Sequence, residues 1–421
     1  MYRFKKLCIS VVIASCIGLV ACEGTESRKE KYIGVGLEML EQGNLEKARI
    51  SFKNVLKIDP KDIKANFYYA KTLEKLEDWP AAAGQYKHVL DLKPDHTEAA
   101  IALGKILLLA KAADQALEQA ENVINREQEN PDALVLKAGA LLIKGETDAG
   151  VVLVDRVLAA HPGHADASIL RSSIYLEKRD LLMAEKVLKT ASEADSKNVS
   201  VLVLLSRVYA MQAKNAEAEA VLKAIISAQP RPEHYSKLAE FYFRAKQYAE
   251  SEKTLTDGIK AFPDSEPLKR TLISVIEAQG DVTRAESALK TFIKSSDEPE
   301  VLSVYLAEKL FQWQRESDAE KLLNEIAEQK VSSKAALSAM NMLAVYKQSK
   351  GESEQALALI DKVLEKNAND VQALNFRARV SLEKGNYDGA VNDLRSALNQ
   401  EKNNVQLMKP LVLAYLKRGD I

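Results

Sequence analysis

The residues whose types and spacing could do chemistry are two histidines in one short polar stretch. His161 and His164 flank Pro162-Gly163, and Asp166 follows two positions later. Imidazole and carboxylate side chains bind zinc, but a structural site needs four ligands. No further His or Cys is placed by the sequence to complete such a site. The stretch is therefore predicted to be a polar turn without a metal, and no cofactor is expected.

No other set of residues in the sequence suggests catalysis. The segment IGVGLE, from Ile33, has two glycines of a phosphate-binding loop but lacks the third, and it lies within a helical pattern. A nucleophile, a histidine and a carboxylate in a recognisable arrangement are also missing. The sequence therefore predicts a protein that is not an enzyme.

The three cysteines all lie near the start of a chain of 421 residues: Cys8, Cys16 and Cys22. The chain begins with the basic MYRFKK, continues with an apolar run of about 15 residues and turns polar at Glu23. This run is shorter than the roughly 20 residues that a spanning helix needs. Residues 1–21 are therefore predicted to be a secretory signal peptide, with an uncleaved amino-terminal anchor as the alternative.

The end of the apolar run, Leu19-Val20-Ala21-Cys22, resembles the lipobox of bacterial lipoproteins. The resemblance implies that the thiol of Cys22 is acylated and that the chain is cut just before it. Residues 22–28 would then form a flexible lipidated tether. Glu23 differs from the aspartate that usually signals retention in the inner membrane, so the expected location is the periplasmic face of the outer membrane of a Gram-negative bacterium.

The charge of the chain argues against a nucleic-acid partner. Its formal net charge is −1, and loss of Arg3, Lys5 and Lys6 with the signal peptide would make it −4. A nucleic-acid-binding domain shows a basic surplus, so no nucleic-acid partner is expected. Apolar residues make up 47% of the chain and charged residues 28%, a balance typical of a soluble, mainly helical protein.

The elements that must position any site come from an internal repeat. ARISFKNVLKIDPKDIKA, from Ala48, aligns without a gap with AAGQYKHVLDLKPDHTEA, from Ala82. The same small residue recurs along the chain, and eight of the ten intervals are identical, at Ala48, Ala82, Ala116, Gly150, Ala184, Ala218, Ser251, Ala285, Ala319, Ala356 and Ala390. A large apolar residue usually follows four positions later, on the same helical face. This pattern predicts helical hairpins that pack closely through the small residue.

A period of about 34 residues resembles the tetratricopeptide repeat. The resemblance covers residues 29–404 as eleven repeats and implies an all-α solenoid, a right-handed superhelix of helix-turn-helix units. Glycines at six of the expected turns should adopt a left-handed backbone: Gly43, Gly145, Gly280, Gly351, Gly385 and Gly419. Three repeats depart from the family pattern, because Lys137, Arg171 and Arg377 occupy a position that usually holds leucine.

Residues 405–421 supply only the first helix of a twelfth repeat. Leu407, Leu411 and Tyr415 are expected to lack their second-helix partner there. The sequence favours a piece of a longer repeat protein, with a terminal capping helix as the alternative.

In the tetratricopeptide family the first helices line the concave face, where partners usually bind. Mapped onto those positions, six aromatic and arginine residues are predicted to form a partner-binding site: Phe243, Arg244, Arg270, Tyr305, Phe311 and Trp313. Aromatic and arginine side chains often dominate binding energy. The alternative is that Phe243 and Phe311 pack between adjacent first helices.

A lipobox followed by a short tail and a long repeat array resembles the lipoproteins associated with exosortase (PEP-CTERM) sorting and exopolysaccharide systems. The favoured function is a lipid-anchored periplasmic scaffold that binds other proteins in an envelope assembly. Two alternatives stay open. One is a glycan-binding factor for polysaccharide export, and the other is an assembly lipoprotein for outer-membrane proteins or pili.

Overall fold

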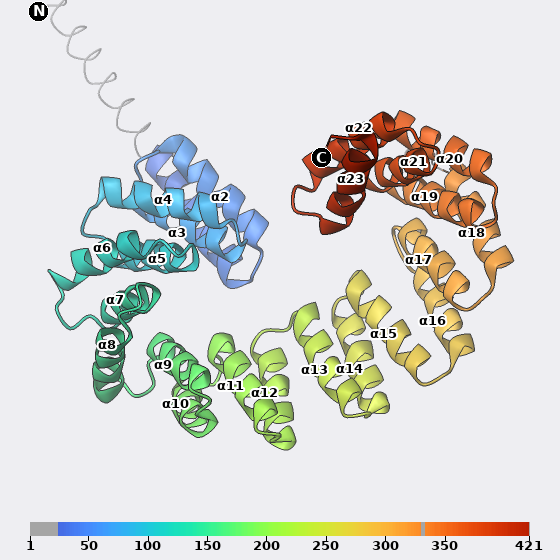
Figure 1. The fold of residues 1–421 in the computed structure, drawn as a ribbon. Helices are drawn as coiled ribbons and strands as arrows, with labels where there is room; N and C mark the ends of the chain where they lie inside the picture. The colour runs from blue at the N-terminus through green and yellow to red at the C-terminus, as the bar shows by residue number, and fades with distance from the viewer. Residues whose placement is uncertain (1–23, 330–332, 421) are drawn as a thin grey trace, which may run out of the picture. The chain divides into compact units, whose positions relative to one another are not determined.

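The computed structural model describes residues 24–329 and 333–420, and Figure 1 shows them as a succession of helices. Cys22 and the predicted signal peptide lie outside the described residues. The chain divides into two compact units, with the boundary between Gln229 and Pro230. No helix in the described part is long and apolar enough to cross a membrane.

From residue 24 onward, where its description begins, unit 1 contains six helical hairpins. Its first helix covers residues 24–41, and the others are α2 (Leu45–Ile58), α3 (Ile63–Lys75), α4 (Trp79–Leu92), α5 (Thr97–Leu109), α6 (Ala113–Ile124), α7 (Pro131–Ile143), α8 (Thr147–Ala160), α9 (Ala165–Glu177), α10 (Leu181–Ala194), α11 (Val199–Met211) and α12 (Asn215–Ala228). Residues 24–28 are thus helical, which corrects their assignment to a flexible tether. Lys29 stabilises this start of the array because its ammonium binds Asp59 at 2.9 Å and Asp62 at 3.1 Å.

The described residues of unit 2 form five hairpins and one further helix. These are α13 (Pro232–Arg244), α14 (Tyr248–Ala261), α15 (Glu266–Ala278), α16 (Val282–Lys294), α17 (Pro299–Gln312), α18 (Glu316–Gln329), α19 (Lys334–Ser349), α20 (Ser353–Lys366), α21 (Val371–Glu383), α22 (Tyr387–Gln400) and α23 (Val405–Arg418). Each first helix packs against its own second helix and against the neighbouring hairpins. This is the all-α arrangement of a tetratricopeptide-repeat solenoid.

The small residue of each second helix is buried throughout the array, as the repeat predicted. Ala285, for example, is fully buried, and so is Leu289, four residues later on the same face. Because the small residue lets the paired helices approach closely, the large one can fill the space beside it. Leu222 is the exception among the large residues, since it is only half-buried.

The hairpin turns share one left-handed backbone position. All six predicted glycines have positive φ, which confirms their role, and six residues with side chains take the same position in other hairpins: Glu77, Lys111, Arg179, Ala213, Lys246 and Gln314. The N–H of the next residue returns to a carbonyl five residues back, for example Asp78 to Leu73 at 3.0 Å. This closure satisfies a helix-end carbonyl whether or not the turn has glycine.

The three basic residues that replace leucine link neighbouring repeats. Lys137 binds Glu121 at 3.0 Å, and the guanidinium of Arg171 binds Asp155 at 2.8 Å. In each case the carboxylate lies on the second helix of the preceding repeat. Arg377 binds Asp361 in the same manner at 3.6 Å and also binds Asp393 of its own hairpin at 2.8 Å. The departure from the family pattern is thus explained by ion pairs.

The last described helix, α23, packs against the hairpin that precedes it. Leu407 is buried, and Leu411 and Tyr415 pack partly against the preceding hairpin. They have partners because a first helix contacts the repeat before it as well as its own second helix. The exposed apolar side chains of α23 are different ones, namely Val405, Met408, Val412, Leu413 and Leu416.

Candidate functional site

The structure distributes the six predicted site residues among three neighbourhoods of unit 2. The first neighbourhood is the end of α13. The Phe243 ring is 37% exposed and contacts the Tyr248 ring edge-on, with ring centres 5.5 Å apart. The Arg244 guanidinium is largely exposed and binds Glu240, one turn earlier, at 2.6 Å.

The second neighbourhood joins α15 and α17 through charged groups. The Arg270 guanidinium lies 4.2 Å from the centre of the Tyr305 ring, which is buried, and it also binds Glu266. The Lys309 ammonium is 5.4 Å from the centre of the same ring. A cation over an aromatic face is a favourable contact, so Arg270 and Lys309 both stabilise the position of the Tyr305 ring.

Glu277 completes this second neighbourhood. Its carboxylate accepts hydrogen bonds from the Lys309 ammonium at 2.8 Å and from the indole N–H of Trp313 at 2.8 Å. Burial is the largest single influence and lowers the pKa of Lys309, but the hydrogen bonds and charges of Glu277 and Tyr305 together outweigh it, so the pKa is raised overall. The buried charges are therefore paired and bonded, which indicates a role in stability for Trp313 and Lys309.

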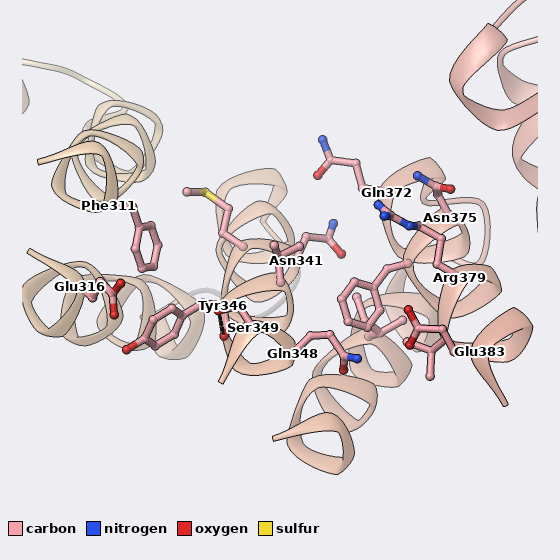
Figure 2. Close-up of a pocket in the computed structure, with 15 residues that line it drawn as sticks. Phe311, Glu316, Asn341, Tyr346, Gln348, Ser349, Gln372, Asn375, Arg379 and Glu383 are labelled. Carbon is pink, nitrogen blue, oxygen red and sulfur yellow. Dashed lines mark hydrogen bonds between the residues drawn. The ribbon is translucent and has the colours of Figure 1, made fainter. Parts of the chain in front are cut away.

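The third neighbourhood is a pocket of about 780 Å³, which we call the α19 pocket (Figure 2). It is lined by side chains of α17 to α21: Phe311, Glu316, Asn341, Met342, Val345, Tyr346, Gln348, Ser349, Ile360, Gln372, Asn375, Phe376, Arg379, Val380 and Glu383. Phe311 is the one residue of the predicted six that lines it. A concave, mainly apolar pocket with a few polar groups is the usual form of a binding site.

Aromatic rings form part of the wall of the α19 pocket. Phe311 and Tyr346 lie with ring centres 5.1 Å apart. Phe311 also packs against two buried clusters, one around Leu289 and one around Leu343. Its ring is half-buried, so Phe311 both supports the fold and faces the pocket. The alternative that Phe311 packs between neighbouring helices therefore describes part of its role.

The rim of the α19 pocket has charged groups of both signs. The Lys350 ammonium binds Glu316 at 2.6 Å and lies 5.4 Å from the centre of the Tyr346 ring. The hydrogen bond with Glu316 raises the pKa of Lys350. Arg379 and Glu383 are exposed on α21, one turn apart. The charges of the rim are thus balanced.

Several residues of the α19 pocket were not singled out by the sequence, above all Asn341, Gln348, Asn375 and Arg379. One signal could have found two of them. Asn341 and Asn375 lie one repeat apart, at the same position of successive first helices. Asparagine is a poor residue for a helix interior, so its recurrence at one repeat position indicates a role other than helix formation.

The histidine pair has a structural role in unit 1. His164 begins α9, where its Nδ1 accepts a hydrogen bond from the N–H of Ala167 at 3.3 Å. His161 ends α8, and Asp166 binds the Lys105 ammonium at 2.5 Å. Among the described residues, no group of three or more His, Cys, Asp or Glu side chains could hold a metal ion. This stretch is a polar turn between repeats.

Sequence-family models identify the repeats independently. Two models described as tetratricopeptide repeat match the chain, one at residues 39–106 and 175–239 and the other at residues 341–404. The last range includes most of α19, all of α20 to α22 and much of the α19 pocket. No curated protein matches the chain.

Solved structures are similar in fold at low sequence identity. The tetratricopeptide-repeat domain of P58(IPK) is 19% identical, with 93% of this chain and 98% of that chain covered and a TM-score of 0.30. PilF of Pseudomonas aeruginosa is 16% identical, covering 53% of this chain and 99% of its own, with a TM-score of 0.37. MamA of Desulfovibrio magneticus is 20% identical. The match covers 41% of this chain and 97% of the MamA chain, with a TM-score of 0.35.

Proposed function

Because the chain is an all-α solenoid of tetratricopeptide repeats, we propose that it is a lipid-anchored periplasmic scaffold that binds a protein of a cell-envelope assembly. Proteins with these repeats bind other proteins and generally act as scaffolds without catalytic activity. The observation that carries the proposal is the α19 pocket, because it combines half-buried aromatic rings with polar groups on successive first helices that have no partner within the described part of the chain. Binding energy concentrates in such pockets.

The sequence supports the cellular part of the proposal. Leu19-Val20-Ala21-Cys22 provides the lipidation signal, and the layout resembles lipoproteins of exosortase sorting and exopolysaccharide systems. Two acyl chains on Cys22 are enough for stable anchoring in a membrane. The partner is therefore expected to be an exported protein that meets the scaffold at the periplasmic face of the outer membrane.

A protein partner suits the α19 pocket better than a glycan does. Stacking of sugar rings would be favoured by aromatic faces that lie open to solvent. Phe311 and Phe376 instead pack partly against the buried cluster around Leu343, and the pocket between them is lined by aliphatic side chains such as Met342. An apolar side chain of a partner could fill this space and lose contact with water.

Replacing Cys22 by serine is expected to abolish lipidation, because only the thiol can form the thioether. Metabolic labelling with a radioactive fatty acid in a Gram-negative host should tag the wild-type chain in the membrane fraction. The Cys22→Ser chain should stay untagged and retain its signal peptide. Cys16→Ser is the control and should be tagged normally. Fatty-acid label on the Cys22→Ser chain would show that the assignment of Cys22 is wrong.

The partner site can be tested by cross-linking in cells. A photo-reactive amino acid at position 383, on the rim of the α19 pocket, should form a covalent adduct with an exported protein, whereas the same group at position 237 should not. Arg379→Ala should reduce the adduct about five-fold, which corresponds to ~1 kcal/mol for an interface arginine. Its melting temperature should match that of the wild type, because Arg379 is exposed. Adducts at position 237 alone would exclude the pocket as the partner site.

A further inference from the structure

Three side-chain carbonyl oxygens of the α19 pocket have no hydrogen-bond partner among the described residues. They are Asn341 Oδ1, Gln348 Oε1 and Asn375 Oδ1, and each atom is covered from solvent. Buried polar groups in folded proteins are nearly always bonded, and an unsatisfied acceptor is unfavourable. Three such acceptors in one pocket indicate that a ligand supplies the missing donors.

The orientation of Asn341 is fixed by the protein. The residue is only 6% exposed, and its Nδ2 donates to Asp370 Oδ1 at 3.0 Å. The same carboxylate oxygen accepts from the N–H of Ala373 at the start of α21. Turning the amide over would place its oxygen against this carboxylate, so that two acceptors would face each other. The Asn341 oxygen is therefore directed away from Asp370 and requires a donor from elsewhere.

An asparagine with a purely structural role looks different in unit 1. Asn66 is 1% exposed, and its Nδ2 donates to the carbonyls of Pro60 and Asp62, both at 2.9 Å. Its Oδ1 accepts from the side-chain amide of Gln85. Every polar atom of this buried amide is thus bonded within the protein. Other buried side-chain atoms without a partner, such as Gln212 Oε1 and Ser168 Oγ in unit 1, lie outside the α19 pocket, whereas three carbonyl oxygens of this kind gather within it.

The spacing of Asn341 and Asn375 suits an extended chain. They lie one repeat apart on α19 and α21, two helices that contact each other. Packed helices are roughly 8–10 Å apart, and an extended chain advances about 3.3 Å per residue. The two asparagines could therefore accept from main-chain N–H groups two or three residues apart in one segment.

The remaining pocket residues restrict the side chains of such a segment. Phe311, Tyr346 and Phe376 provide rings, and Val345 is 60% exposed beside them. These groups favour an apolar side chain. Lys350 already binds Glu316, and Arg379 and Glu383 contribute one charge of each sign. Neither a strongly basic nor a strongly acidic segment is favoured by this balance.

We propose that the α19 pocket recognises the main chain of an extended, uncharged internal segment of its partner. Main-chain N–H groups of the segment donate to Asn341 Oδ1 and Asn375 Oδ1, while an apolar side chain lies among the rings of Phe311 and Phe376. Rim side chains such as Gln372 turn aside when the segment enters. This inference rests on the proposed function for the existence of a protein partner and adds how the partner is recognised.

The test uses the full chain and a pool of heptapeptides with both ends capped, built from Gly, Ala, Val, Leu, Ser, Thr, Asn and Gln. The tightest binder is made again with its central peptide nitrogens methylated, which removes N–H donors and keeps every side chain. Methylation should weaken binding at least ten-fold. Asn375→Leu should weaken the unmethylated peptide similarly, and combining the two changes should weaken binding little further.

Asn324→Leu is the matched control, because Asn324 is exposed on α18 outside the pocket, and it should leave peptide binding unchanged. Methylation is tested on the wild-type protein, so its result does not depend on how the variants fold. Equal binding of both peptides, no binding from the pool, or binding of maltoheptaose in place of peptide would overturn the inference. If a cross-linked exported protein is still recovered at position 383, only the recognition mode fails. If that adduct is absent too, the proposed function fails with it.

Discussion

Replacing Glu277 by glutamine is expected to lower the free energy of unfolding by about 3 kcal/mol at neutral pH, since removing one partner of a buried ion pair leaves a charge uncompensated. Lys309 is 9% exposed, and its ammonium binds the Glu277 carboxylate at 2.8 Å. Glutamine preserves an acceptor for the indole of Trp313, so the variant removes mainly the negative charge. Urea denaturation of wild type and variant measures the difference.

The pH dependence of this effect has a definite sign. In the wild type the pKa of Lys309 is raised above its usual 10.5, so the pair stabilises the protein below that pH and the contribution is lost as pH rises through the raised value. In Glu277→Gln the burial of Lys309 acts without the carboxylate and should lower its pKa. The variant should therefore gain stability as the pH rises from about 8 to about 10, where the wild type does not.

Two further variants separate the buried charge from other effects. Glu240→Gln removes the partner of Arg244, which is largely exposed, and it should leave stability almost unchanged because exposed pairs contribute little. The double variant Glu277→Gln with Lys309→Met removes both charges and should recover most of the lost stability. If the double variant is no more stable than Glu277→Gln, the loss does not come from an unpaired lysine.

Phe311→Ala is expected to destabilise unit 2 by roughly 3 kcal/mol, the lower end of the range for a core phenylalanine. Its half-buried ring packs against the clusters around Leu289 and Leu343 and contacts Tyr346, so its removal leaves a cavity. Phe243→Ala is the matched control. The Phe243 ring is 37% exposed and has an edge-on contact with Tyr248, so its loss should cost less than about 1 kcal/mol.

Thermal melting and urea denaturation of the two alanine variants give this comparison directly. Equal stabilities would mean that Phe311 does not support the core. Because Phe311 also lines the α19 pocket, its alanine variant should lose partner binding through misfolding as well as through lost contact. Exposed rim residues such as Arg379 are therefore better probes of the binding site than Phe311.

The fold could be predicted from the sequence because every repeat needs the same residue types at the same packing positions. Each small residue must let two helices approach, so Ala285 and its equivalents recur once in every repeat and are buried. The turn position was predictable only where it holds glycine. Lys111 and Gln314 take the same left-handed conformation, but nothing in their side chains indicates it, since the closing hydrogen bonds belong to the backbone.

The candidate site was less predictable. The sequence shows that a residue is aromatic or charged, but it does not show which side chains surround that residue in the fold. Tyr305 and Trp313 are residue types that are common in binding sites. In the structure, however, the Tyr305 ring is buried beside two cations, and the Trp313 indole donates a hydrogen bond to Glu277. Asn341 and Asn375 are ordinary polar residues in the sequence. Their importance appears only when the structure shows carbonyl oxygens without donors, a property of atoms that a residue type does not specify.

The residue at each left-handed turn affects which hairpins unfold locally most easily. A residue with a side chain is strained at positive φ, whereas glycine is not. In a repeat protein the stability is roughly the sum of contributions from each repeat, so this strain lowers the stability of the hairpin that contains it. Four of six hairpins in unit 1 turn at residues with side chains, against two of five in unit 2. The hairpins of α19 and α21 turn at Gly351 and Gly385, whereas that of α17 turns at Gln314. Fluctuations should thus begin in the hairpin of α17 and α18, which contributes Phe311 and Glu316 to one wall of the α19 pocket, while the walls formed by α19 and α21 remain more rigid.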